Sequence, residues 1–185
     1  MKLCSERYEE IDKEVIKMFN KISIKSFPVD CFDVCKQLGY KVFAYSEVKG
    51  TAREALIDAS KDGCSSLVEL ERGVFEYWIF YNDEMRRSRI RFTIFHEIGH
   101  IILGHTEESD LAESEANHFA AYALVPPPLV HQANVEDYID IANIFDVSTE
   151  SAYYAMIRYT SWLKYGARDY LEHEERIIQL FESFM

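Results

Sequence analysis

The chain has 185 residues, of which 48% are hydrophobic and 14% aromatic, so its composition excludes a disordered or fibrous protein. It carries 20 Lys and Arg against 32 Asp and Glu, a formal net charge of −12. Because affinity for nucleic acid depends on neutralising phosphates, this charge argues against direct nucleic-acid binding and favours a basic partner.

The lengths of the apolar segments also exclude a membrane-spanning protein. The longest apolar stretches, residues 75–81 and 98–103, are far shorter than the ~20 residues that span a bilayer. Residues 1–12 are charged and lack the apolar core of a signal peptide. We therefore expect a cytoplasmic protein without membrane contact.

The first half of the chain predicts two helices and a small sheet. Apolar residues three and four apart predict a helix over residues 5–24. Asp30 and Gly39 are typical of the start and the end of a second helix, over residues 31–38. Strand character in residues 40–45, 65–70 and 74–81, with a hairpin loop at 71–73, predicts a small antiparallel sheet.

The rest of the chain is predicted to be helical. The expected helices cover residues 89–103, about 109–125, 135–145, 149–163 and 168–183, with prolines 126–128 ending the second of them. The predicted fold class is therefore α+β. We expect an α+β core over residues 1–134 and a helical C-terminal segment, 135–185, that packs on it as part of one compact domain.

Residues 96–100 read His-Glu-Ile-Gly-His and carry the clearest chemical signal. Histidines four apart on a helix lie on one face and can bind one zinc ion, while Glu97, offset around the helix, can act as general base towards a water that the metal activates. Polar side chains within such an apolar helix need partners, and Zn²⁺ would supply one. The alternative is a buried helix with hydrogen-bonded histidines and no metal.

A third metal ligand is expected from the following helix, which offers Glu113 and Glu115. Glu113 lies one turn before Asn117, which could hold its carboxylate from the second shell, and the spacing favours it. Glu115 shares a helix face with Phe119 and stays open as the alternative. The sequence offers His105, Tyr153 and Tyr154 among the candidates for an oxyanion or substrate contact without choosing between them.

Two runs, residues 91–105 and 113–126, resemble the ImmA/IrrE family of zinc metallopeptidases. The second run is similar to the family pattern E-x-E-A-N-x-F-A followed by L-L-M-P, although here the last four residues read Ala-Leu-Val-Pro. The similarity covers about residues 75–165. It implies a zincin-like, gluzincin-type core with zinc on His96, His100 and Glu113 and with Glu97 as the general base.

The resemblance also implies a role, namely an intracellular endopeptidase that cuts helix-turn-helix repressors of mobile elements or stress regulons. The alternative is a non-catalytic antirepressor that keeps the fold and works by binding, but the intact His-Glu-x-x-His set favours the enzyme. A DNA-binding regulator is disfavoured further because residues 149–157, the second helix of a helix-turn-helix-like segment, contain no Lys or Arg.

Overall fold

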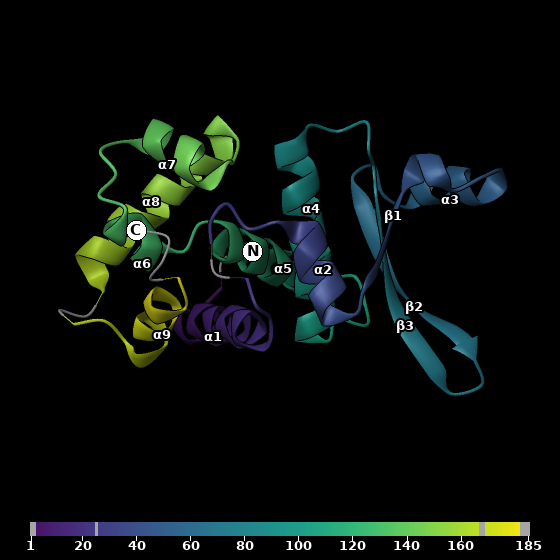
Figure 1. Cartoon of the computed structure of the whole chain (residues 1–185), viewed down its shortest axis with the longest axis horizontal. Coiled ribbons are helices and arrows are strands. Elements are labelled where there is room, and N and C mark those ends of the chain that lie inside the picture. The colour runs from purple at the N-terminus through teal and green to yellow at the C-terminus, as the bar shows by residue number, and fades with distance from the viewer. Residues whose placement is uncertain (1–2, 25, 167–168, 182–185) are drawn as a thin grey trace. The chain divides into compact units, whose positions relative to one another are not determined.

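The computed structural model describes residues 3–24, 26–166 and 169–181 and confirms the α+β class (Figure 1). Most of the described residues are helical, and a three-stranded sheet lies in the N-terminal half. Within the described part of the chain, no helix has both the length and the apolar character that crossing a bilayer requires.

The contacts divide the described residues into two compact units. One unit is Asp30–Ala120, and the other combines Leu3–Val29 with the described residues after Ala120. This grouping does not test the predicted boundary after residue 134 or the expected packing as one domain, which stay predictions.

The first unit contains the sheet, whose strand order is β1-β3-β2. The strands are β1 (Lys41–Ala44), β2 (Gly63–Glu71) and β3 (Val74–Tyr81). The predicted antiparallel hairpin of β2 and β3 is confirmed, but β1 pairs with β3 in parallel, so the sheet is mixed rather than antiparallel throughout. A parallel neighbour needs a long connection, and here a 3₁₀ turn (Tyr45–Glu47), α3 (Thr51–Ala59) and β2 lie between the two strands.

Two helices of the first unit pack on the sheet. The helix α2 (Cys31–Leu38) contacts β1, and α4 (Arg87–Leu103) contacts β2 and β3. The bounds of α2 are those predicted, because the Asp30 side chain accepts hydrogen bonds from the first-turn amides and Gly39 adopts the left-handed conformation that ends the helix.

Close approach of β2 to α4 requires glycine at position 63. A Cβ atom there would lie 2.5 Å from Thr93 Cγ2 of α4 and 2.7 Å from the Phe80 carbonyl oxygen of β3. The first residues of β2 are thereby held directly against α4, the helix that carries the histidines.

The second unit is entirely helical within its described residues. It contains α1 (Ser5–Lys21), α6 (Pro127–Gln132), α7 (Tyr138–Phe145), α8 (Thr149–Tyr165) and α9 (Glu172–Leu180). Phe19, Phe27, Phe145 and Phe181 pack together in its core. Residues 168, 182 and 183 of the predicted last helix lie outside the described residues.

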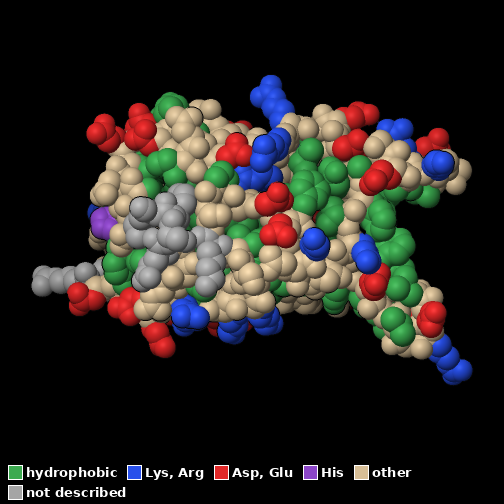
Figure 2. All heavy atoms as spheres, in the orientation of Figure 1, with side chains coloured by type: hydrophobic (Ala, Val, Ile, Leu, Met, Phe, Trp, Pro, Cys, Tyr) green, Lys and Arg blue, Asp and Glu red, His purple; other side chains and the backbone are tan. Residues whose placement is uncertain are grey.

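Part of the sheet is open to solvent. Figure 2 shows hydrophobic side chains along the sheet between α3 and the turn of the β2–β3 hairpin. The strand residues that are about half exposed and apolar are Leu67, Leu70, Val74 and Phe75.

Candidate functional site

The two histidines of α4 converge as the spacing predicts. His96 and His100 lie one turn apart, and their Nε2 atoms are 2.9 Å from each other. Both side chains are largely buried, at 14% and 19% exposed. Flanking apolar residues hold this part of α4 in the core, since Ile94, Phe95 and Ile98 are fully buried.

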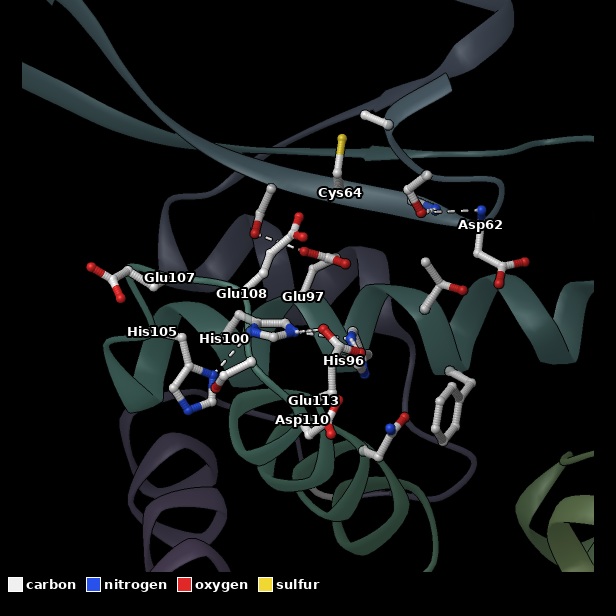
Figure 3. A pocket seen from close by; sticks show the side chains of 18 of the residues that line it. Asp62, Cys64, His96, Glu97, His100, His105, Glu107, Glu108, Asp110 and Glu113 are labelled. Carbon is white, nitrogen blue, oxygen red and sulfur yellow. Dashed lines mark hydrogen bonds and ion pairs between the residues drawn. The ribbon is translucent and has the colours of Figure 1, made fainter. Parts of the chain in front are cut away.

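The helix α5 (Asp110–Leu124) brings a carboxylate to the same point. Glu113 Oε2 lies 3.5 Å from His96 Nε2, and Glu113 Oε1 lies 3.3 Å from His100 Nε2 (Figure 3). Close helix packing permits this reach, because a Cβ atom at Gly99 would lie only 3.0 Å from Phe119 Cβ of α5. Glycine at position 99 therefore allows α5 to pack closely against α4.

One ligand atom from each of His96, His100 and Glu113 lies within 4.8 Å of the others. Two ligands about 2.0 Å from one tetrahedral zinc ion are roughly 3.3 Å apart, which matches the two distances to Glu113 and is slightly longer than the separation of the histidines. Two imidazoles and one carboxylate are also a donor set that zinc accepts. These residues therefore fit a divalent metal, and their assignment as ligands stays a prediction.

Glu97 lies next to the cluster formed by His96, His100 and Glu113 and is almost entirely buried, at 7% exposed. The Ser65 hydroxyl of β2 donates a hydrogen bond to Glu97 Oε2 at 2.7 Å. Burial raises the pKa of Glu97 to about 7, with a smaller upward effect from Glu113 and an opposing one from Ser65. A carboxyl group with this pKa can accept and release a proton near neutral pH, as a general base must.

Burial also favours the neutral form of the histidines. It lowers the pKa of His96 to about 4, helped by the charge of His100 and opposed by Glu113 and by a hydrogen bond to Asn117. Burial lowers the pKa of His100 too. A metal ligand must be neutral imidazole, so burial favours the form of both side chains that ligation requires. Asn117 was expected to hold Glu113; it lines the same cleft and interacts with His96.

His105 and Glu115 form a hydrogen-bonded chain behind His100. His105 Nδ1 lies 2.9 Å from His100 Nδ1, and His105 Nε2 lies 3.0 Å from Glu115 Oε2. The Glu115 side chain is 7% exposed and that of Glu113 is 52% exposed. The two carboxylates left open by the sequence thus have different positions, with Glu113 beside His96 and His100 and Glu115 in the core.

The cluster opens into a cleft of about 800 Å³ between the start of β2, α4, and the loop that leads into α5. Figure 3 shows His96, His100 and Glu113 pointing towards one another at its floor. Tyr153 and Tyr154 lie on α8 in the second unit, with their side chains 53% and 55% exposed, and their predicted oxyanion role stays a prediction. Ser65 carried no signal in the sequence, because only the tertiary fold brings it to Glu97.

The sequence matches the Peptidase_M78 family, described as the IrrE N-terminal-like domain, over residues 35–156. The chain therefore belongs to this peptidase family, and the resemblance to ImmA/IrrE proteins is confirmed. The matched region contains the cluster, Glu97, His105 and Glu115. No curated protein matches the chain significantly.

Proposed function

We propose that this member of the IrrE N-terminal-like peptidase family is a zinc-dependent endopeptidase that cleaves a DNA-binding repressor in the cytoplasm. One observation carries the proposal: the ligand atoms of His96, His100 and Glu113 lie within 4.8 Å of one another in a cleft that also contains a buried glutamate. Bound zinc would polarise the scissile carbonyl and make water a nucleophile at neutral pH.

Glu97 performs the proton transfer in this proposal. It accepts a proton from the attacking water and passes it to the leaving amine, and its place beside the ligand His96 in the cleft suits both steps. Ser65 fixes the carboxylate by donating to its Oε2 atom. Burial of Glu97 keeps bulk water from competing for the proton.

The cleft supports a peptide as substrate. β2 is an edge strand, since β3 is its partner on one side within the sheet order β1-β3-β2, and Gly63, Cys64 and Ser65 of β2 line the cleft. An extended peptide can add to such an edge through main-chain hydrogen bonds. The scissile bond would then pass over the metal cluster beside Glu97.

The charge of the cleft supports a basic substrate segment. Arg89 of the cleft wall is paired with Asp62, and Glu107, Glu108 and Asp110 are exposed on the loop and helix start that border the cluster (Figure 3). Glu113 and the three exposed carboxylates together outweigh the charge of a divalent ion, so the loaded cleft would stay negative even with Glu97 protonated. Repressors bind DNA with Lys and Arg, and they therefore have segments that suit this surface.

The test has a metal arm and a cleavage arm. We expect close to one zinc per chain by mass spectrometry of the purified protein. We also expect cleavage of a repressor encoded beside its gene, with loss of cleavage in chelator and recovery on adding zinc. Glu97→Gln should keep the zinc and lose cleavage, whereas Glu71→Gln, an exposed change outside the cleft, should keep both.

The outcomes separate the proposal from its alternative. Cleavage by Glu97→Gln at the wild-type rate would refute the assignment of the base. Tight binding of the repressor without cleavage by any zinc-loaded form would favour a non-catalytic antirepressor.

A further inference from the structure

Glu115 and His105 form an ordered chain that ends at His100, with Glu115 buried in the core and His105 at the wall of the cleft. Glu115 is 7% exposed and His105 is 12% exposed at the side chain. A buried carboxylate is costly unless it accepts hydrogen bonds, and His105 Nε2 at 3.0 Å supplies one. Residues two apart on a helix do not share a face, which is why Glu115 points inwards while Glu113 points to the cluster.

One set of donors and acceptors satisfies these contacts and leaves a lone pair for a metal. Glu115 accepts from His105 Nε2, and His105 Nδ1 accepts from His100 Nδ1 across 2.9 Å. His100 Nε2 then carries the lone pair that ligation requires, and this atom faces His96 Nε2 at 2.9 Å and Glu113 Oε1 at 3.3 Å.

We infer that Glu115 and His105 are positioning residues that hold His100 in the Nδ1–H tautomer and so present its Nε2 lone pair to the metal. The inference rests on the proposed metal site and adds a role that the ligands themselves do not have. It also reassigns His105, because both of its ring nitrogens are engaged and neither is left to donate to an oxyanion.

The two histidines of the cluster differ in this respect. His96 Nδ1 is a buried atom without a hydrogen-bond partner among the described residues, so no chain like that of His105 and Glu115 ends on it. Gly104, in the left-handed conformation at the end of α4, turns the chain so that His105 returns beneath His100. The hydrogen-bonded chain of His105 and Glu115 thus supports His100 and not His96, and the turn at the end of α4 places His105 in it.

The first test reads the tautomer directly in the metal-free protein. Long-range proton–nitrogen NMR of ¹⁵N-histidine-labelled chain should show His100 as Nδ1–H and His105 as Nε2–H. In Glu115→Ala, His100 should lose this single form. Glu115→Gln should keep it, because the amide oxygen can still accept from His105. A wild-type His100 in the Nε2–H form would overturn the inference, whether or not the protein binds zinc.

The second test measures zinc affinity by competition with a chelating dye. Glu115→Ala should weaken binding about 10–100-fold, as removal of such an outer partner does, and Glu115→Gln should recover part of the loss. Glu107→Ala is the matched control, since Glu107 is an exposed acidic residue of the same loop region, and it should change affinity less than about 3-fold.

If Glu107→Ala and Glu115→Ala lost equal amounts of zinc affinity, the inference would be overturned, because the loss would then reflect only the removal of a negative charge. A melting scan of each metal-free variant shows whether Glu115→Ala still folds. If it does not, the zinc affinity of Glu115→Gln is compared with that of the wild type instead. If the wild type binds no zinc, the proposed function fails, and the NMR result still decides the tautomer.

Discussion

Replacing Glu97 by Gln should change how stability depends on pH. In the folded, metal-free chain, burial raises the pKa of Glu97 to about 7, whereas the ordinary value for the carboxyl group is 4.5. Between these values the folded state retains a proton that the unfolded state has released. Because the folded state then binds more protons, the unfolding free energy falls as pH rises through this window.

The magnitude follows from the two pKa values. A difference of one pKa unit corresponds to about 1.4 kcal/mol, and integrating over the range from about pH 5 to about pH 8 gives a loss of about 2.5 kcal/mol in the wild type. The glutamine side chain of the variant does not titrate, and its amide oxygen can still accept from Ser65. The variant should therefore gain about 2.5 kcal/mol relative to wild type over the same range.

Urea unfolding of both proteins at the two pH values, with chelator present, measures this change. His96 and His100 titrate in both proteins, so their contributions largely cancel in the difference. Glu107→Gln, an exposed change on the neighbouring loop, is the control for the replacement of a carboxylate by an amide. A difference between wild type and Glu97→Gln that stays constant from about pH 5 to about pH 8 would refute the buried, proton-retaining state of Glu97.

Three further changes test the framework of the site. Gly99→Ala should lower the unfolding free energy measured by chemical denaturation by about 1 kcal/mol, because crowding against Phe119 outweighs the gain in helix propensity, and an unchanged or higher stability would contradict the close packing of α5 on α4. Asp30→Ala should cost about 1 kcal/mol by loss of the α2 cap, and Asp30→Asn much less. Zinc should raise the melting temperature of the wild type but not of His96→Gln, and equal shifts would contradict the predicted ligand.

The sequence alone determined the features that depend on local spacing. Two histidines four apart must share a helix face, so one half of the cluster could be predicted from residues 96–100. The bounds of α2 also depend only on nearby residues, since Asp30 and Gly39 supply its cap and its end. The β2–β3 hairpin was predicted because a short connection joins neighbouring antiparallel strands.

Elements with weak local signals were missed. The helix α3 was not predicted although residues 52, 55, 56 and 59 are apolar at helical spacing, because three of these four are alanines and give the face little hydrophobic character. The prolines at 126–128 predict the end of a helix, yet α6 begins at Pro127, because proline fits the first turn, where its missing N–H is not needed. The parallel pairing of β1 joins strands separated by α3 and β2, and no local pattern encodes it.

Only the tertiary structure determined which polar side chains contact His96, Glu97 and His100. Glu113 and Glu115 have nearly the same local sequence context, and the packing of α5 against Gly99 turns one to the cluster and the other into the core. The same packing brings His105 to Glu115, and the approach of β2 to α4 brings Ser65 to Glu97. Hydrogen bonds of this kind depend on distances between separate elements, and those distances are fixed by how side chains fill the core.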